Sequence, residues 1–204
     1  MQSKKTYQAI FDFESALADY TGAPYVVATD GCTHSIMLAM KLYDIKKCEC
    51  TAFTYLSVIQ ALQHLNIDYT LTDEQWIGEY QFHSTNIWDS ARKLEPNMYK
   101  KNQIQCLSFG INKPMSIGKV GAILLDDEKA YVELSKMRAD GRDLKTYPLT
   151  GATEWSEQQQ FKNGYHFCPT LDDCTRGIEM LKSHKPESQQ IIYPDCRKLV
   201  ISTE

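Results

Sequence analysis

Residues 103–125, QIQCLSFGINKPMSIGKVGAILL, contain two apolar, strand-like runs that flank a polar turn. The runs cover residues 103–109 and 121–125, and each has the length of a buried β-strand. Lys113 lies in the turn, five positions after Ser108 at the end of the first run. A lysine at the end of a sheet, close to a hydroxyl group, suits an imine-forming amine beside an anion-binding group. The alternative reading of Lys113 alone is a solvated surface charge.

Further runs extend this pattern along the chain. Apolar positions at helical spacing predict an amphipathic helix in the first twenty residues, and short apolar runs predict strands between helices. The expected strands are residues 25–29, 49–55, 68–72, 85–89, 103–109 and 121–125; the expected helices start after residues 30–33 and cover 56–65, 127–142 and 171–181, with a polar loop at 147–163. Alternation of this kind predicts an α/β fold, a three-layer α/β/α domain with a mostly parallel sheet of about six strands.

Length and composition are those of one globular domain, residues 1–204, which is 43% hydrophobic and 24% charged. The net charge of −4 gives no electrostatic support for a nucleic-acid partner. No apolar stretch approaches the roughly 20 residues of a membrane helix, and no signal-peptide core follows the N-terminus. We therefore expect no nucleic acid and no membrane among the partners.

The seven cysteines are an odd, scattered set, and we expect reduced thiols in a cytoplasmic protein. Cys48 and Cys50 are too close for the usual C-x-x-C pair, and no second pair matches them. The five histidines lack metal-ligand spacing, so we expect no metal site.

Polar side chains end several of the predicted strands. The turn at residues 30–35, DGCTHS, leads from a strand into a helix, where backbone N–H groups and Thr33 could bind an anion. Tyr55 could lie flat on a planar ligand, and Asp89 could hold a protonated ring nitrogen. Each has a structural alternative: a helix N-cap for the turn and for Asp89, and a core aromatic for Tyr55.

Taken together, these groups resemble the parts of a pyridoxal phosphate site. Thr33 and Ser108 could bind the phosphate, Tyr55 the ring, Asp89 the ring nitrogen and Lys113 the aldehyde. Ligands of open α/β sheets bind at the carboxyl ends of the strands, where all five residues fall.

In this order, the motifs resemble the DegT/StrS-type sugar aminotransferases, pyridoxal-phosphate enzymes of fold type I. The similarity lies in GCTHSIMLAM at 31–40, FTY at 53–55, WDSA at 88–91, SFGINK at 108–113 and GKVGA at 118–122. Residues 138–142, RADGR, are similar to the family's R-x-x-G segment, and residues 164–167, GYHF, fall where the family has G-x-N-x-R.

The resemblance implies roles for particular residues. It makes Lys113 the Schiff-base lysine and Asp89 the partner of the pyridine nitrogen. These two are the implied catalytic residues. Cys32, Thr33, Tyr55 and Ser108 are implied as further cofactor contacts. Two departures add to this list: Arg92 replaces the family's glutamine or histidine near the phenolic oxygen of the cofactor, and His166 replaces an asparagine that reaches into the partner subunit's site.

The resemblance also implies an activity: an aminotransferase that uses a keto sugar, nucleotide-linked, as acceptor and an amino acid such as glutamate as donor, in a cytoplasmic homodimer with shared active sites. The chain resembles a reduced large domain. Asp73 and Asn86 are only 13 positions apart, where the family has a helix, a strand and a helix, and the C-terminal small domain is largely missing.

Three alternatives stay open. Sugar dehydration or epimerisation on the same cofactor would retain Lys113 as well. A degenerate homologue that binds cofactor or a partner chain without turnover would fit the shortened interval. An unrelated α/β domain with chance matches is the third.

Overall fold

The computed structural model describes residues 7–145 and 161–199. The helices are α1 (Gln8–Thr21), α2 (Cys32–Leu42), α3 (Leu56–His64), α4 (Glu128–Met137), α5 (Leu171–Leu181) and the 3₁₀ helix η2 (Cys196–Lys198). The strands are β1 (Tyr25–Thr29), β2 (Lys47–Thr51), β3 (Asp68–Thr72), β4 (Tyr80–Gln81), β5 (Ile87–Asp89), β6 (Lys93–Leu94), β7 (Ile104–Ser108), β8 (Gly121–Leu125) and β9 (Glu187–Ser188).

The central sheet has five strands in the order β1-β8-β7-β5-β4. Only β5 and β7 are parallel; β8 is antiparallel to both of its neighbours, and β4 is antiparallel to β5. The α/β fold and the shortened form are confirmed, and all six expected strands form. The sheet is mixed, however, and not mostly parallel. The chain turns back after β7 through a short loop without a crossover helix, so β8 must run in the opposite direction.

The remaining two expected strands, β2 and β3, form a separate parallel pair. A backbone bridge joins this pair to the β4–β5 hairpin: the Glu49 N–H donates to His83 O (3.3 Å), and the His83 N–H donates to Glu49 O (2.9 Å). In the short interval between β3 and β5, a two-residue antiparallel strand, β4, thus fills the space beside β5.

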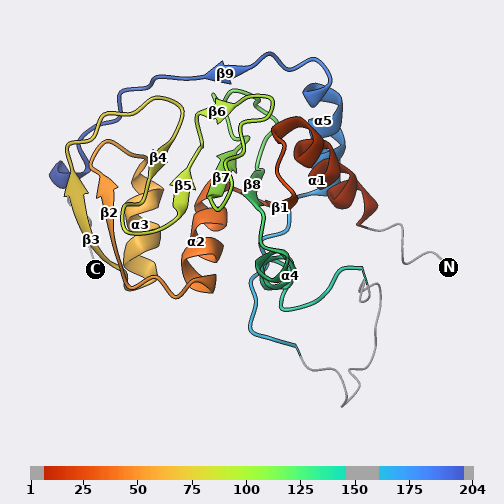
Figure 1. The fold of residues 1–204 in the computed structure, drawn as a ribbon, viewed down its shortest axis with the longest axis horizontal. Helices are drawn as coiled ribbons and strands as arrows, with labels where there is room; N and C mark the ends of the chain where they lie inside the picture. The colour runs from red at the N-terminus through yellow and green to blue at the C-terminus, as the bar shows by residue number, and fades with distance from the viewer. Residues whose placement is uncertain (1–6, 146–160, 200–204) are drawn as a thin grey trace.

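Helices cover both faces of the sheet, as predicted for three layers (Figure 1). Alternate residues of β8 point to opposite faces: Ala122 and Leu124 pack with α1 and α5, and Ile123 and Leu125 pack with α2, α3 and α4. The helical spacing in α1 places Ile10, Phe13 and Leu17 against the first of these faces, where all three are fully buried.

Helix boundaries agree with the sequence prediction within a few residues. The helix expected at residues 127–142 is α4, and Asp127 caps it by accepting hydrogen bonds from the N–H groups of Lys129 (2.8 Å) and Ala130 (3.1 Å). Most of the loop expected at residues 147–163 lies outside the described residues. The assignment of residues 1–204 to a single cofactor-binding domain stays a prediction.

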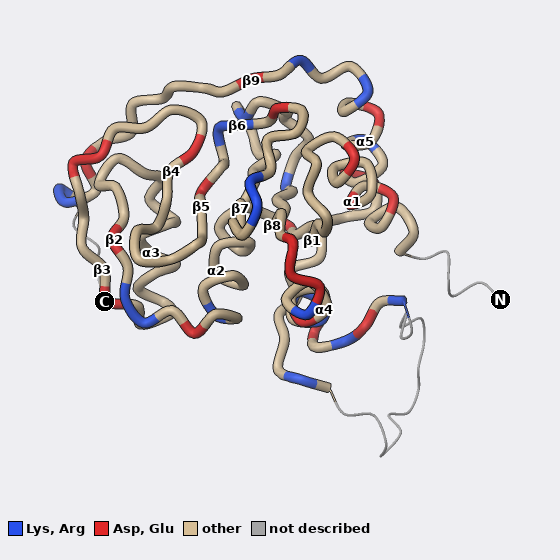
Figure 2. The backbone as a smooth tube through the Cα atoms, in the orientation of Figure 1, with Lys and Arg blue, Asp and Glu red and all other residues tan. Residues whose placement is uncertain are grey.

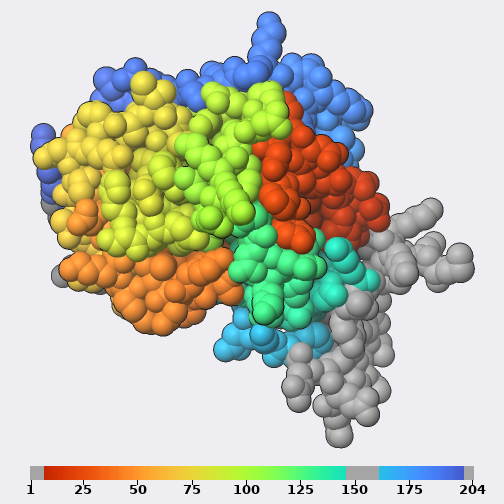
Figure 3. Space-filling model, in the orientation of Figure 1, coloured from red at the N-terminus to blue at the C-terminus, as the bar shows by residue number. Residues whose placement is uncertain are grey.

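After α5, the chain crosses the molecule in a long C-terminal segment, blue in Figure 1. Its strand β9 pairs antiparallel with β6, matching Lys93 with Ser188 and Leu94 with Glu187. Figure 3 shows this segment lying along one rim of the surface, above β6 and the β2–β3 pair. We call residues 187–196 the C-terminal strap.

Acidic and basic residues are interspersed along the described backbone (Figure 2). Within the same residues, no helix is long and apolar enough to cross a bilayer. No group of three or more histidine, cysteine or carboxylate side chains in the described part of the chain is arranged to hold a metal ion.

Candidate cofactor site

The carboxyl ends of β5 and β7 meet at one edge of the sheet because these two strands are parallel. Asp89 is the last residue of β5, and it pairs with Cys106 in β7. Ser108 is the last residue of β7 and pairs with Gly121, the first residue of β8. The predicted strand-end residues Asp89 and Ser108 therefore lie at the same edge.

The N-terminus of α2 reaches this edge through a close backbone approach. A Cβ atom on Gly121 would lie 2.4 Å from the carbonyl carbon of Gly31 and 2.5 Å from the nitrogen of Cys32, so only glycine fits there. A Cβ on Gly31 itself would meet no atom within 4 Å. The first turn of α2 thus packs directly on the start of β8, with open space beside Gly31. Its unpaired N–H groups form the kind of helix end that binds anions.

A second helix N-terminus lies next to the first. The hydroxyl of Thr33 in α2 lies 2.6 Å from that of Ser57 in the first turn of α3. Sequence reasoning predicted Thr33 but missed Ser57. Its signal was present, since a serine in the first turn after Tyr55 is placed as Thr33 is after Gly31. Two helix N-termini with a pair of hydroxyl groups are a stronger anion site than one.

Asp89 is a buried carboxylate held only by neutral donors. Its side-chain oxygens accept hydrogen bonds from the Ala91 N–H (2.9 Å) and the Tyr80 hydroxyl (3.0 Å), and the Cys32 thiol lies 3.9 Å away. It forms no ion pair within the described residues. Burial raises the pKa of Asp89 above its ordinary value, while the positive charge of Lys113 and these hydrogen bonds lower it in part.

Tyr80 is a second site residue that sequence reasoning missed. The residue is 1% exposed. Its hydroxyl donates to Asp89 (3.0 Å) and lies 2.7 Å from the hydroxyl of Thr54. Burial and the neighbouring Asp89 raise the pKa of Tyr80 far above its usual range, so the phenol stays protonated and donates. Tyr80 belongs to β4, a two-residue strand with too little periodicity to be recognised in the sequence.

Cys32 lies between the helix and the sheet. Its thiol donates to the carbonyl of Cys106 (3.4 Å) and faces Asp89. Burial, together with Asp89, holds the pKa of Cys32 far above its usual range, so the thiol is neutral. The predicted residue Cys32 is therefore part of the Asp89 surroundings.

Lys113 lies in the turn after β7, half-buried. Its backbone N–H donates to Gly110 O (3.3 Å), and Asn112 before it adopts a left-handed conformation with φ of 63°. Within the described residues, the Lys113 amine forms no hydrogen bond or ion pair, yet its charge lowers the pKa of Asp89. Within these residues the amine is therefore unengaged, in the turn that follows β7, the strand beside Asp89.

Tyr55 directly precedes α3, and its side chain is 61% exposed. It is therefore not a core aromatic, which was the alternative reading. Its ring centroid lies 6.3 Å from that of Tyr193 in the C-terminal strap, with the ring planes 68° apart. An exposed ring beside the two helix N-termini is free to cover a planar ligand.

Arg92 is buried, and protein acceptors take up its guanidinium. Its Nε and one terminal nitrogen donate to the Tyr193 hydroxyl at 3.0 and 2.9 Å, and the other terminal nitrogen donates to Gln189 (2.9 Å) and to Asn112 O. The predicted contact of Arg92 with a cofactor oxygen stays a prediction. What the structure shows is a link between the strap and the residue before Lys113.

His166 is not brought to the Asp89 surroundings within one chain. Its ring contacts the Asp140 carboxylate at 3.2 Å, and its side chain is 84% exposed. A role in a partner's site stays a prediction. Arg138 of the R-x-x-G segment is buried, where it pairs with Glu14 and stabilises the packing of α4 on α1.

These residues fit pyridoxal phosphate by the chemistry of their groups. Among residues 7–145 and 161–199, Asp89 is a buried carboxylate without an ion-pair partner and Lys113 offers an unengaged amine. The α2 and α3 N-termini offer N–H and hydroxyl donors. The exposed Tyr55 ring completes the set.

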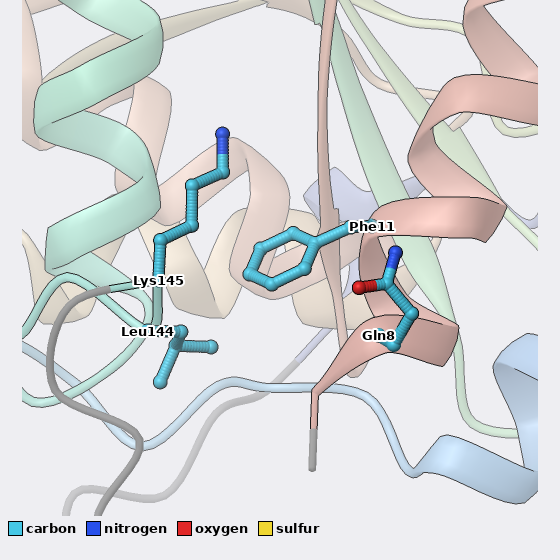
Figure 4. A pocket seen from close by; sticks show the side chains of 4 residues that line it. All are labelled: Gln8, Phe11, Leu144 and Lys145. Atoms are coloured by element: carbon cyan, nitrogen blue, oxygen red, sulfur yellow. The ribbon is translucent and has the colours of Figure 1, made fainter. Parts of the chain in front are cut away.

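A pocket elsewhere on the molecule contains none of these residues. Gln8, Phe11, Leu144 and Lys145 line it, between α1 and the segment after α4 (Figure 4). The Lys145 ammonium lies 5.4 Å from the centroid of the Phe11 ring. We assign this pocket no role.

Comparison with known proteins confirms the resemblance to the family. Residues 2–75 match the model of the DegT/DnrJ/EryC1/StrS aminotransferase family. A comparison with curated protein sequences finds no match. Similar solved structures include 3-amino-5-hydroxybenzoic acid synthase, with 16% identity and a TM-score of 0.69 over 86% of this chain and 56% of that one.

Two further structures agree. PseC of Helicobacter pylori, an aminotransferase involved in the biosynthesis of pseudoaminic acid, has 12% identity and a TM-score of 0.65 over 90% of this chain and 60% of that one. NtdA of Bacillus subtilis, solved with its cofactor PMP, has 16% identity and a TM-score of 0.71 over 85% of this chain and 48% of that one. At these identities the likeness establishes the fold, and the chain spans about half to three-fifths of each relative.

Proposed function

We propose that the protein is a pyridoxal-phosphate-dependent aminotransferase. Its acceptor is a keto sugar, nucleotide-linked, and its donor is an amino acid such as glutamate. The reaction type follows the family that residues 2–75 match, and the sugar class follows relatives such as PseC. The observation that carries the proposal is a buried Asp89 that has no ion-pair partner within the described residues, at the sheet edge where the Lys113 turn begins.

Asp89 binds the protonated ring nitrogen in this proposal. A buried carboxylate is unfavourable unless a cation or strong donors compensate it, and a pyridinium supplies the missing positive charge. Tyr80 and Ala91 orient the carboxylate from the protein side. The bound cofactor supplies an electron-withdrawing ring that stabilises negative charge at the substrate carbon.

Lys113 would hold the cofactor through its amine, and the same amine would move a proton at the substrate carbon. It must be neutral for this step. Within the described part of the chain its amine has no protein acceptor, which favours proton transfer over a fixed ion pair.

The phosphate binds where the N-termini of α2 and α3 meet. Thr33, Ser57 and Ser108 add hydroxyl donors to the backbone N–H groups, and the first turn of α2 adds the positive end of its dipole. Tyr55 covers the exposed face of the ring. No residue of the chain identifies the sugar.

We further propose a cytoplasmic homodimer with shared sites. Exposed apolar side chains at Tyr55 (61%), Ile111 (82%) and Ile192 (88%) flank the residues of the site and would be covered by a second copy. Sedimentation of the active protein tests this, and a strictly monomeric active enzyme would contradict it.

The decisive test is covalent trapping of the cofactor. The protein is mixed with pyridoxal phosphate, reduced with borohydride and digested, and the modified peptide is mapped by mass spectrometry. We expect modification at Lys113 and a visible absorption band before reduction. Label spread over surface lysines, with no band, would refute the proposal.

A matched pair of variants completes this test. Lys113→Ala should lose the band and the trapped label, and its transamination rate should fall by at least about 10²–10⁴-fold, the range of an acid–base group. Lys119→Ala removes an exposed lysine of the same loop and should behave as the wild type. Unfolding in denaturant should be similar for both variants, because neither amine packs in the core.

The non-catalytic alternative is favoured by one observation, the short interval between β3 and β5, which holds only the two-residue strand β4. Trapping at Lys113 without conversion of any amino donor would support it. Turnover of an amino donor that depends on added cofactor would exclude it.

A further inference from the structure

The C-terminal strap is fixed at both ends across the edge that carries the proposed site. At one end, β9 pairs with β6, the Gln189 N–H donates to Arg92 O (2.8 Å), and the Gly78 N–H donates to Gln189 O (3.1 Å). At the other end, the Cys196 N–H donates to Ala52 O (2.8 Å). Figure 1 shows the segment between these anchors passing over the edge.

Tyr193 is the residue by which the strap enters the site. Its ring stacks on Trp76, with 5.8 Å between centroids and 13° between planes, and it also meets the Tyr55 ring. Trp76 is itself fixed, because its indole N–H donates to Phe53 O (2.7 Å). The Tyr193 hydroxyl is thereby held at a defined point above β5.

Arg92 connects the Tyr193 hydroxyl to the Lys113 turn. Two of its nitrogens donate to the one Tyr193 oxygen, a third reaches both Gln189 and Asn112 O, and the side chain is 7% exposed. The guanidinium is planar and rigid, so fixing one end of it fixes the other.

The tip of the turn, before Lys113, has few other restraints. Ile111 is 82% exposed, and the hydrogen bonds near Lys113 are its own N–H to Gly110 O (3.3 Å) and the Ser116 hydroxyl to Gly110 O (3.0 Å). The packing of the loop begins only at Met115, which is 2% exposed. A tip with little packing takes its position from its hydrogen bonds. The bond from Arg92 to Asn112 O is therefore a main determinant of where Lys113 lies.

We propose that the C-terminal strap positions Lys113 through Tyr193 and Arg92, and that Tyr193 is a positioning residue of the proposed site. The inference rests on the proposed function for its chemistry, but the mechanical coupling is a property of the protein alone. Gln189 supports the same contact from the strap.

Hydrogen exchange of the cofactor-free protein tests the coupling first. Tyr193→Phe keeps the stacked ring and removes the oxygen that accepts from Arg92. We expect exchange of the amides in residues 110–113 to rise at least about threefold, consistent with local loosening. Tyr99→Phe is the matched control: it removes one hydroxyl, which donates to Gln103 O (3.0 Å), and should leave residues 110–113 unchanged.

Two further experiments test the coupling without relying on Tyr193→Phe alone. Gln189→Leu removes a different acceptor of Arg92, the Gln189 side-chain oxygen, and should raise hydrogen exchange in residues 110–113 as well. Adding Tyr193→Phe to Arg92→Lys should add little to the effect of Arg92→Lys alone, because both act on one contact. Additive effects, or loosening confined to residues 187–196 with residues 110–113 unchanged, would overturn the proposal and leave the strap as a cover.

Cofactor binding is the final readout. Tyr193→Phe should weaken the apparent affinity for pyridoxal phosphate by about tenfold, or about 1.4 kcal/mol, and should lower the fraction trapped on Lys113. If the wild type traps no cofactor, the proposed function fails while the exchange result still decides the coupling. If the wild type traps cofactor and Tyr193→Phe traps it equally well, this inference fails alone.

Discussion

Asp89 and Arg92 are buried charges three positions apart, and their surroundings differ in kind. Asp89 accepts from Ala91 and Tyr80, close in sequence, and has no ion-pair partner in the described part of the chain. Arg92 donates hydrogen bonds to groups 97 and 101 positions away in the strap, and these acceptors satisfy its guanidinium. A charge left without a counterion indicates a binding role, and a charge whose hydrogen-bonding groups are filled by the protein indicates a structural one.

This contrast predicts opposite effects on stability. The largest is expected for Arg92→Gln, which leaves the Tyr193 hydroxyl and Asn112 O without their donors. We expect a loss of about 2–4 kcal/mol in the free energy of unfolding. Denaturant titration measures it, and Arg176→Gln, at a half-exposed arginine paired with Asp173, is the control with a loss below about 1 kcal/mol. Equal losses in the free energy of unfolding for the two variants would contradict a structural role for Arg92.

The next largest effect concerns the close backbone approach between α2 and β8 near Asp89. Gly121→Ala places a methyl group against Gly31 and Cys32, so α2 must move away from β8. We expect a loss of about 1–3 kcal/mol from overpacking. Gly110→Ala is the matched control, since its nearest neighbour would be at an ordinary 3.7 Å, and should change stability by less than about 0.5 kcal/mol. Thermal unfolding that ranks the two changes alike would show that the close approach is dispensable.

Tyr80→Phe removes a neutral donor from Asp89. Thr54 and Asp89 both lose a partner in a buried position, so we expect a loss of about 1–2 kcal/mol at neutral pH. Tyr69→Phe, whose hydroxyl accepts from an exposed Gln63, should cost almost nothing. A null result for Tyr80→Phe in urea unfolding would mean that Asp89 does not depend on this phenol.

The smallest effect has the opposite sign. The folded-state pKa of Asp89 is raised above its ordinary value of 3.8, so the folded protein binds the proton more tightly than the unfolded chain. Stability is therefore fully present below 3.8 and is lost as pH rises from there through the folded-state pKa. Asp89→Asn should remove this loss and stabilise the cofactor-free protein at neutral pH by about 1 kcal/mol, while abolishing transamination.

The measurement is unfolding of both proteins across pH. The gain from Asp89→Asn should be largest at neutral pH and should shrink on acidification. A variant that is less stable than the wild type at every pH would make Asp89 a structural residue like Arg92 and end the contrast.

Much of the fold could be predicted from short apolar runs, because β1, β3 and β8 were found at their expected residues. Strand direction could not be read the same way. The loop between β7 and β8 has no helix, and an antiparallel return was the simpler path for it. Weighing that connection length would have predicted a mixed sheet.

The residues of the site also fall into a predictable and an unpredictable group. Asp89, Cys32, Thr33 and Ser108 follow strands directly, so topology alone brings them to one edge. Tyr80 comes from a two-residue strand, and Tyr193 joins Arg92 across 101 positions. Contacts over such distances leave no periodic signal in the sequence, and only the tertiary structure reveals them.

The sequence separation of Arg92 and Tyr193 has a consequence for synthesis. Arg92 emerges from a ribosome 101 residues before its partner, which at typical elongation rates is about 5–20 s. Once β8 has emerged, the central sheet has all five strands, but the guanidinium still lacks its acceptors in the strap and has only Asn112 O and water. Nascent chains stalled before residue 187 should therefore carry a formed sheet and a loose Lys113 turn; a turn already protected in such chains would contradict this order.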